Sequence, residues 1–358
     1  MVRRLETIDA HVGGQPLRLI VDGLPRLDGR APDETAAWFG ARADALRRAL
    51  VLEPRGHHDM TAACLTEPAA PSSHAGLVFM DADGYPALLG HGVIAAVTIA
   101  IERGLIVAPE VDGRVALTLD TAAGPVRAVA RLQAAGVGRR VAGVTFSGVP
   151  SFVREPGRTV TVSGRTLTVD VADAAGVFAI TDSEAAGIPL DGAHLPELRR
   201  LGMALCEALA PASASDDAVD GASGAAGGVA APTDATSFEA SGAPAPPSGV
   251  VFVGASHHPE AHLRLVTVSR SGVVDRSATG AGLLAAVAVL DAMGLVPDGE
   301  PCVCEGLGGL RASGRVERRT AVGEAPAVVV AIDGTAWITG EHVFAIDETD
   351  PLGAGLRL

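Results

Sequence analysis

The chain is poor in aromatic residues, positive charge and long apolar runs, and each shortage excludes a class of protein. Aromatic residues make up only 3% of the 358 residues, so we expect a core built mainly from Ala, Val and Leu. The net charge is −14 and the Arg residues are scattered, which argues against nucleic acid as a partner. No apolar run reaches the roughly 18 residues of a membrane span, and the N-terminal stretch lacks the apolar region of a signal peptide. We therefore expect a cytoplasmic protein, long enough for two domains, that binds no membrane.

Cysteine is also scarce, and its four positions are Cys64, Cys206, Cys302 and Cys304. A cytosolic setting argues against structural disulfides, so most of these residues are interpreted as buried core thiols. For Cys302-Val303-Cys304 we expect the two thiols on opposite faces of a strand, which would make a poor metal clip. For Cys64 a buried thiol is favoured over a place in a binding cleft. The sequence thus predicts no metal site.

The chain does contain two glycine-rich turns, each followed by an apolar helix. They are Gly90-His91-Gly92 and Gly280-Ala281-Gly282, and each following helix ends in Gly-Leu. Glycines let a ligand approach the backbone closely, and the N-terminus of a helix attracts a carboxylate or phosphate. A single such turn is more often only a tight turn. The duplication predicts two similar halves that aim two helix N-termini at one anion.

Many short strands and few helices indicate an α+β architecture in which each half wraps a sheet around one central apolar helix. Helices are expected at Asp33–Leu50 and Leu195–Ala208, and a hairpin at Thr159–Val171 with a Ser-Gly turn. The N-terminal half is predicted to comprise residues 1–125 with about 335–358, and the C-terminal half residues 126–334. Residues 211–248, almost all Ala, Ser, Gly, Pro, Asp and Thr, are interpreted as a flexible insertion.

A dense polar segment, Glu53–Met60, lies between two apolar segments. Polar residues concentrated on a loop are typical of a functional site, because loops carry sites on a rigid scaffold. A solvated turn with Asp59 as its cap explains the same pattern, and both interpretations stay open at this point.

At these motifs the chain resembles the proline racemase family, which also contains 4-hydroxyproline 2-epimerases and trans-3-hydroxy-L-proline dehydratases. The resemblance implies a fold like that of diaminopimelate epimerase, with two pseudo-symmetric halves meeting at a cleft, and a reaction without pyridoxal phosphate or metal. In the racemases, two cysteines on opposite faces of the substrate Cα act as general base and general acid. The motifs that carry the resemblance are Ile8–Pro16, Glu53–Met60, Leu65–Pro68, Val149–Val153, Trp337–Gly340 and the two glycine-rich turns.

The chain departs from the family pattern at the reacting groups. Leu89 stands at the first cysteine position and Thr279 at the second, while Thr61 stands where a Tyr is usual. Leu has no proton to exchange and Thr is a poor base, so a two-thiol racemase is excluded. The family's dehydratases keep the first cysteine and carry Thr at the second position. The resemblance therefore implies a cofactor-independent lyase for a 3-hydroxyproline-like cyclic imino acid.

The remaining motif residues define the expected site. Asp275 is expected to receive the secondary amine of the substrate, and a His or Asp to replace the lost thiol base. Two alternatives stay open, a racemase or epimerase with other bases, and a catalytically silent imino-acid-binding homologue. The expected partners are a small amino or imino acid and, as one open arrangement, a second copy of the chain. The predicted catalytic residues are Thr279, His91, His57 and Asp59, and the predicted binding residues are Gly90, His91, Gly92, Asp275, Gly280, Ala281 and Gly282.

Overall fold

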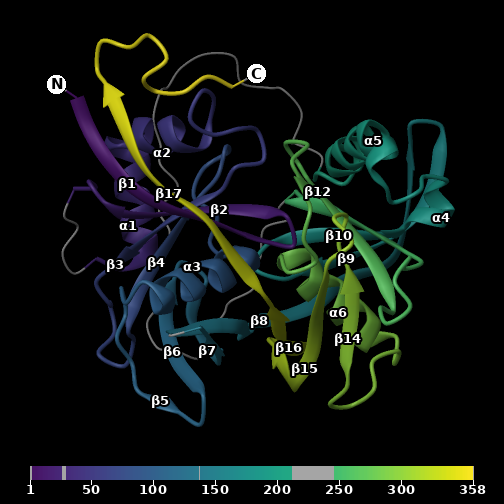
Figure 1. Ribbon diagram of the computed structural model, residues 1–358. Coiled ribbons are helices and arrows are strands. Elements are labelled where there is room, and N and C mark those ends of the chain that lie inside the picture. Colours follow the sequence, from purple (N-terminus) through teal and green to yellow (C-terminus); the bar gives the residue numbers. More distant parts are fainter. Residues whose placement is uncertain (1, 26–29, 137, 212–245, 358) are drawn as a thin grey trace.

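The computed structural model of the protein describes residues 2–25, 30–136, 138–211 and 246–357. The insertion predicted at residues 211–248 lies almost wholly outside these ranges. The described chain forms two lobes side by side (Figure 1). Where one half ends and the next begins stays a prediction, but both lobes are built mainly of strands, as the α+β interpretation requires.

The strands of both lobes are joined by hydrogen bonds into one 17-stranded sheet in the described residues. Long strand β8 runs from one lobe into the other and pairs with β7, β9 and β16 (Figure 1). In chain order, the first strands are β1 (Val2–Val12), β2 (Gln15–Asp22), β3 (Ala62–Thr66), β4 (Ala75–Met80), β5 (Glu110–Val111), β6 (Arg114–Thr121) and β7 (Gly124–Ala135). They are followed by β8 (Gly138–Val162), β9 (Arg165–Asp173), β10 (Val177–Asp182), β11 (Gly249–Gly254), β12 (Leu263–Ser269), β13 (Val274–Asp275), β14 (Pro301–Glu305), β15 (Arg311–Val322), β16 (Ala325–Gly334) and β17 (Ala336–Asp347).

The two apolar helices predicted from the repeat are α3 (Gly90–Glu102) and α6 (Ala281–Ala292), and both are buried. They end in the same way. Gly104 and Gly294 adopt left-handed φ angles of 65° and 72°. Leu105 and Leu295 then donate their N–H groups to helix carbonyls at 2.8 and 2.9 Å, which closes a Schellman motif at each C-terminus. The Gly-Leu dipeptide that follows each of the two helices in the sequence is therefore explained by the Schellman motif.

The other helices lie on the surfaces of the lobes: α1 (Pro32–Arg42), α2 (Asp44–Val51), α4 (Ser183–Ala186), a 3-10 turn (Gly192–His194) and α5 (Leu195–Ala208). The expectation of one continuous helix at 33–50 is wrong. The segment is helical, but Ala43 has φ −143° and divides it into α1 and α2. The expected helix at 195–208 is confirmed. The expected hairpin is confirmed too, with Ser163 and Gly164 at φ 51° and 76°, the left-handed values of a tight hairpin turn.

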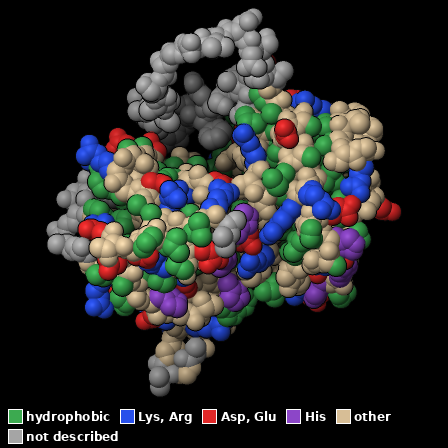
Figure 2. Space-filling view, turned by 90° about the horizontal axis from the view of Figure 1, so that it is seen from above, with side chains coloured by type: hydrophobic (Ala, Val, Ile, Leu, Met, Phe, Trp, Pro, Cys, Tyr) green, Lys and Arg blue, Asp and Glu red, His purple; other side chains and the backbone are tan. Residues whose placement is uncertain are grey.

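No helix within the described ranges is long and apolar enough to cross a lipid bilayer. On the face seen in Figure 2, Arg side chains and carboxylates are interspersed rather than gathered by sign. This surface agrees with the scattered Arg residues of the sequence.

The last strand of the chain completes the first lobe. β17 pairs antiparallel with β1 along its whole length, from Val2 opposite Asp347 to Val12 opposite Ala336. β1 pairs on its other side with β2. The first strand of the protein is thus held between its neighbour in sequence and its most distant one (Figure 1).

β14 corrects the expectation for the paired cysteines. Side chains two residues apart on a strand point to the same face, not to opposite faces. The sulfur atoms of Cys302 and Cys304 accordingly lie 3.8 Å apart. Cys64 and Cys206 are buried, as expected of core thiols.

Candidate active site

The N-termini of α3 and α6 meet at the boundary of the two lobes. A Cβ atom at Gly90 would lie only 1.9 Å from the carbonyl oxygen of Thr279, so only glycine permits this approach. The first N–H groups of a helix have no acceptor within it. The meeting point therefore brings the free N–H groups near Gly90, His91, Gly280 and Ala281 into one region, as the sequence predicts.

The third residue of each glycine turn has a packing role as well. A Cβ atom at Gly92 would lie 2.6 Å from the ring of Phe79, and one at Gly282 would lie 2.3 Å from the hydroxyl of Thr267. Both contacts are with sheet residues. These two glycines let the helices sit close against the strands, and their predicted binding role stays a prediction.

Asp275 lies beside the first residues of α6. Its Oδ2 is 2.7 Å from the Cβ position of Gly280, and its Oδ1 accepts the N–H of Ser277 at 3.0 Å. Burial raises the pKa of Asp275 to about 7, which outweighs the lowering by the Ser277 N–H and the Arg276 charge. The carboxyl group can thus gain or lose a proton near neutral pH.

Thr279 is buried and its hydroxyl is paired with a second one. Its Oγ1 lies 2.6 Å from the Oγ of Ser277, so a proton can pass between them. Both residues line a cavity of about 360 Å³, whose wall also includes Val12, Asp333 and Trp337. Thr279, which the sequence predicts to be catalytic, is therefore hydrogen-bonded to a second hydroxyl group, and we call Thr279 and Ser277 the hydroxyl pair.

His91 is buried at the start of α3, and its Nε2 lies 3.1 Å from the hydroxyl of Thr61. Thr61 donates its own proton to the carbonyl of Pro16. It must therefore accept from His91, which places the ring proton on Nε2 and leaves Nδ1 unprotonated. Burial lowers the pKa of His91 to about 4, so the ring is neutral at pH 7.

Asp59 joins the two lobes instead of capping a solvated turn. Its Oδ2 accepts from Arg276 at 2.9 Å, and Arg199 lies 3.7 Å from Oδ1. The backbone N–H of Arg276 also donates to Oε1 of Gln15 at 3.1 Å. Two cations thus hold Asp59 across the boundary, a position suited to closing the site.

His57 lies next to this ion pair. Its Nδ1 accepts the N–H of Asp59 at 3.3 Å. Burial, and then the charge of Arg276, lower the pKa of His57, so the ring is neutral at pH 7. The structure therefore brings the predicted His57 and Asp59 together, and Asp59 contacts Arg276, the residue that follows Asp275.

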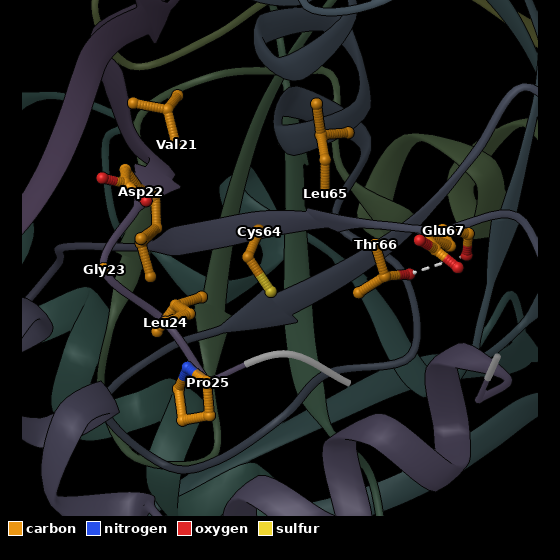
Figure 3. Close-up of a pocket in the computed structure, with 10 residues that line it drawn as sticks. Val21, Asp22, Gly23, Leu24, Pro25, Cys64, Leu65, Thr66 and Glu67 are labelled. Atoms are coloured by element: carbon orange, nitrogen blue, oxygen red, sulfur yellow. Dashed lines mark hydrogen bonds between the residues drawn. The ribbon is translucent and has the colours of Figure 1, made fainter. Parts of the chain in front are cut away.

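Cys64 lies on the other side of its strand from this region. In Figure 3 its thiol points toward Leu24 and Pro25, and neighbouring Leu65 points the opposite way. The pocket drawn there has a volume of about 430 Å³ and contains none of the predicted site residues. Burial raises the pKa of Cys64 to about 12, which makes the thiol inert at neutral pH. The buried-thiol interpretation is confirmed.

Sequence reasoning missed the partners of the predicted residues. Thr61 was noted only as a departure from the family pattern, although it fixes the tautomer of His91. Ser277, Arg276 and Arg199 were not singled out. The position of Ser277 two residues before Thr279 was the available signal for a hydroxyl pair. Within the described residues, no group of three or more His, Cys, Asp or Glu side chains is arranged to hold a metal ion.

Known proteins match this chain over nearly its whole length. The family model described as proline racemase matches residues 7–223 and 244–357. The chain is 32% identical to a proline racemase of Clostridioides difficile, covering 99% of this chain and 98% of that protein. It is 33% identical to a trans-3-hydroxy-L-proline dehydratase of Bacillus cereus, covering 98% and 97%.

Solved structures agree with the sequence relatives. A hydroxyproline epimerase from Agrobacterium vitis with bound trans-4-hydroxy-L-proline superposes with a TM-score of 0.82 at 26% identity, covering 99% of this chain and 95% of the other. A PhzF-family phenazine biosynthesis protein from Bacillus anthracis shares the fold at a TM-score of 0.55 and 12% identity, covering 96% and 99%. The predicted two-lobed α+β fold of the diaminopimelate epimerase type is thus confirmed.

Proposed function

Because the chain belongs to the proline racemase family, we propose that it is a lyase that dehydrates a 3-hydroxyproline-like cyclic imino acid without a cofactor. One observation carries the proposal, the unlike groups on the two sides of the site. Leu89 precedes α3 and has no exchangeable proton, while Thr279 precedes α6 and offers a hydroxyl. Racemisation needs a proton acceptor and a proton donor on opposite faces of Cα. Dehydration needs one base at Cα and one acid at the leaving hydroxyl.

The substrate carboxylate would bind at the meeting helix N-termini. The approach of Gly90 to Thr279 concentrates N–H groups of α3 and α6 there, and both helix dipoles favour an anion. Asp275, beside Gly280, would then lie near the substrate nitrogen. Since that nitrogen is bonded to Cα, the same carboxylate is within reach of the Cα proton.

Asp275 is the base in this proposal. A general base works best with a pKa near the working pH, and the pKa of about 7 for Asp275 meets that condition. His91, with a pKa of about 4, is a weaker acceptor, and Asp59 is held by Arg276 and Arg199. The lost thiol is therefore replaced by a carboxyl group on the α6 side.

The Thr279–Ser277 pair would supply the acid. Asp275 takes the Cα proton, the C3–O bond breaks, and the leaving hydroxyl gains a proton from Thr279 and departs as water. Thr279 regains a proton through the Ser277 hydroxyl, and Asp275 releases the proton that it took to solvent. The electron pair left at Cα forms the new C2–C3 double bond. The resulting enamine then tautomerises to the cyclic imine.

The composition supports a reaction without pyridoxal phosphate. The chain contains no lysine at all. Enzymes that use pyridoxal phosphate hold it as a Schiff base with a lysine. The positive charges around the site come from Arg276 and Arg199, which cannot form that linkage.

The test is proton NMR in D2O with trans-3-hydroxy-L-proline, trans-4-hydroxy-L-proline and both enantiomers of proline. Dehydration removes the Cα signal and the signal of the proton on C3 shifts to that of the product. Exchange at Cα without water loss would instead establish an epimerase. Binding without exchange for every compound would overturn the lyase and establish a silent homologue.

A variant pair separates binding from chemistry. Thr279→Ala removes the acid, so we expect kcat for dehydration to fall by about 10²–10⁴-fold with substrate binding retained in calorimetry. Thr161→Ala removes an exposed hydroxyl on β8 and is the matched control, with unchanged kcat. Equal activity of the two variants would rule out the role of Thr279.

The silent homologue is the second candidate, and Leu89 is the observation that favours it. A leucine at the position that precedes α3 leaves the carboxylate cradle intact and removes the proton exchange on that side. Such a protein would bind an imino acid through the helix N-termini and release it unchanged.

A further inference from the structure

Outside the active site, β14 holds two thiols side by side. The sulfur atoms of Cys302 and Cys304 are 3.8 Å apart, with Cys302 partly exposed and Cys304 buried. Cys302 lies opposite Gly314 of β15. A Cβ atom at Gly314 would lie 3.1 Å from Val287 and 3.4 Å from Leu283, both in α6. The thiol pair therefore faces the central helix of its lobe.

The hydrogen bond between the two thiols, with the neighbouring His262, makes their pKa values differ. Its Nδ1 accepts the N–H of Val303 at 3.1 Å, so the neutral ring carries its proton on Nε2. Hydrogen bonds from Cys304 and then from His262 lower the pKa of Cys302 to about 6. The pKa of Cys304 is raised by its hydrogen bond to Cys302 and by its burial. Cys302 is thus the thiolate at neutral pH, and Cys304 is the thiol beside it.

We propose that Cys302 and Cys304 form a peroxide-sensitive dithiol that closes reversibly into a disulfide within β14. The Cys302 thiolate attacks the peroxide O–O bond, becomes a sulfenic acid and releases water. Cys304 then attacks that sulfur, an S–S bond forms, and a second water leaves. The two thiols are oxidised by two electrons and the peroxide is reduced by the same two.

The closure needs a small local movement of the strand. The sulfur atoms must approach from 3.8 Å to the roughly 2.05 Å of a disulfide. Two residues of extended strand span about 6.6–6.8 Å between their Cα atoms, the upper end of the range that disulfides accept. The segment therefore shortens as the bond forms, and the intervening Val303 moves with it.

Val303 connects this movement to the active site. It lines the same cavity of about 360 Å³ as Thr279 and Ser277. Its backbone is held by His262 on both sides, through the N–H to Nδ1 and through the carbonyl, which accepts from the His262 N–H at 2.8 Å. Oxidation of the pair thus displaces part of the wall beside the hydroxyl pair.

The test treats the reduced full-length protein with a few equivalents of hydrogen peroxide, then alkylates remaining thiols and analyses the peptides by mass spectrometry. We expect Cys302 and Cys304 to be protected from alkylation, with a loss of about 2 Da. Cys64 and Cys206 should stay alkylatable after unfolding, because burial raises their pKa values to about 12 and about 11. Dithiothreitol should restore both alkylation sites.

Variants identify the steps. Cys304→Ser should trap the sulfenic acid on Cys302, which dimedone labels, and Cys206→Ser is the control that leaves disulfide formation unchanged. His262→Ala removes the second of the two hydrogen bonds that lower the pKa of Cys302, so it should move the midpoint of the rate–pH profile upward from near 6. Wild-type protein whose Cys302 and Cys304 remain alkylatable, or gain oxygen without the loss of about 2 Da, would overturn the proposal without any variant.

Discussion

Replacing Asp275 by Asn tests the environment of the carboxyl group directly. The amide keeps the size of the side chain and can still accept the Ser277 N–H, but it cannot ionise. In the wild type, a folded pKa of about 7 exceeds the usual value of about 3.9 for an unfolded chain. The folded state therefore binds more protons between pH 4 and pH 7, and Asp275 reduces the stability as the pH rises through this window.

The size of the effect follows from the pKa gap. At about 1.36 kcal/mol per unit, the gap makes wild-type folding less favourable at pH 8.5 than at pH 5 by up to about 3 kcal/mol from this group alone. Part of the Asp275 surface reaches solvent, so we halve the value to about 1.5 kcal/mol. The variant lacks this pH dependence. The unfolding free energy of the variant minus that of the wild type should therefore be about 1.5 kcal/mol higher at pH 8.5 than at pH 5.

The assay is urea unfolding of both proteins at pH 5 and pH 8.5, read as the difference in unfolding free energy. The depressed pKa of His91 acts in the opposite sense, with stability lost as the pH falls from 6.5 through about 4. That contribution is common to both proteins and cancels in the difference. Asp298→Asn, at an exposed carboxylate paired with Arg319, is the control and should change by less than about 0.5 kcal/mol at either pH.

The reasoning fails if Asp275→Asn destabilises the protein equally at pH 5 and pH 8.5. Such a result would mean that the carboxylate is ionised in the folded state at both pH values. The dehydratase proposal would then lose its base, since Asp275 would have no raised pKa. Loss of activity together with gained stability is the expected pattern for a residue retained for chemistry rather than folding.

Two further substitutions test the helix N-termini. Gly90→Ala places a Cβ atom 1.9 Å from the Thr279 carbonyl, so we expect a loss of at least about 2 kcal/mol of stability and of imino-acid binding in calorimetry. Gly192→Ala, with open space around it, should leave both unchanged, and equal effects would contradict the contact. Leu89→Cys places a thiol at the first cysteine position of the family pattern, so dehydration of trans-3-hydroxy-L-proline followed by NMR should become faster; a slower rate would show that this position does not face the substrate.

The sequence predicted the features that repeat or follow local rules. Gly90 and Gly280 were identified because glycine followed by an apolar helix recurs, and the matched Schellman ends explain why the exits recur as well. The Ser163-Gly164 turn followed from its residue types. The break at Ala43 could not be predicted, because nothing in the side chain of alanine opposes a helix there.

The contacts across the lobes could not be predicted either. The pairing of Arg276 with Asp59 joins residues distant in sequence, and their individual types give no sign of a partner. The raised pKa of Asp275 depends on burial by the whole fold. The paired thiols of Cys302 and Cys304, in contrast, followed from the period of a strand and were predicted wrongly on that simple point.

The pairing of β1 with β17 has a consequence for how the protein is made. Synthesis proceeds from the N-terminus, so Val2–Val12 leaves the ribosome long before Ala336–Asp347. During translation the first lobe therefore keeps one edge of β1 unpaired until β17 is made. By then every strand of the second lobe can already pair. An unpaired edge is a template for association with other chains, so aggregation during translation should concentrate on β1 until the final strand arrives.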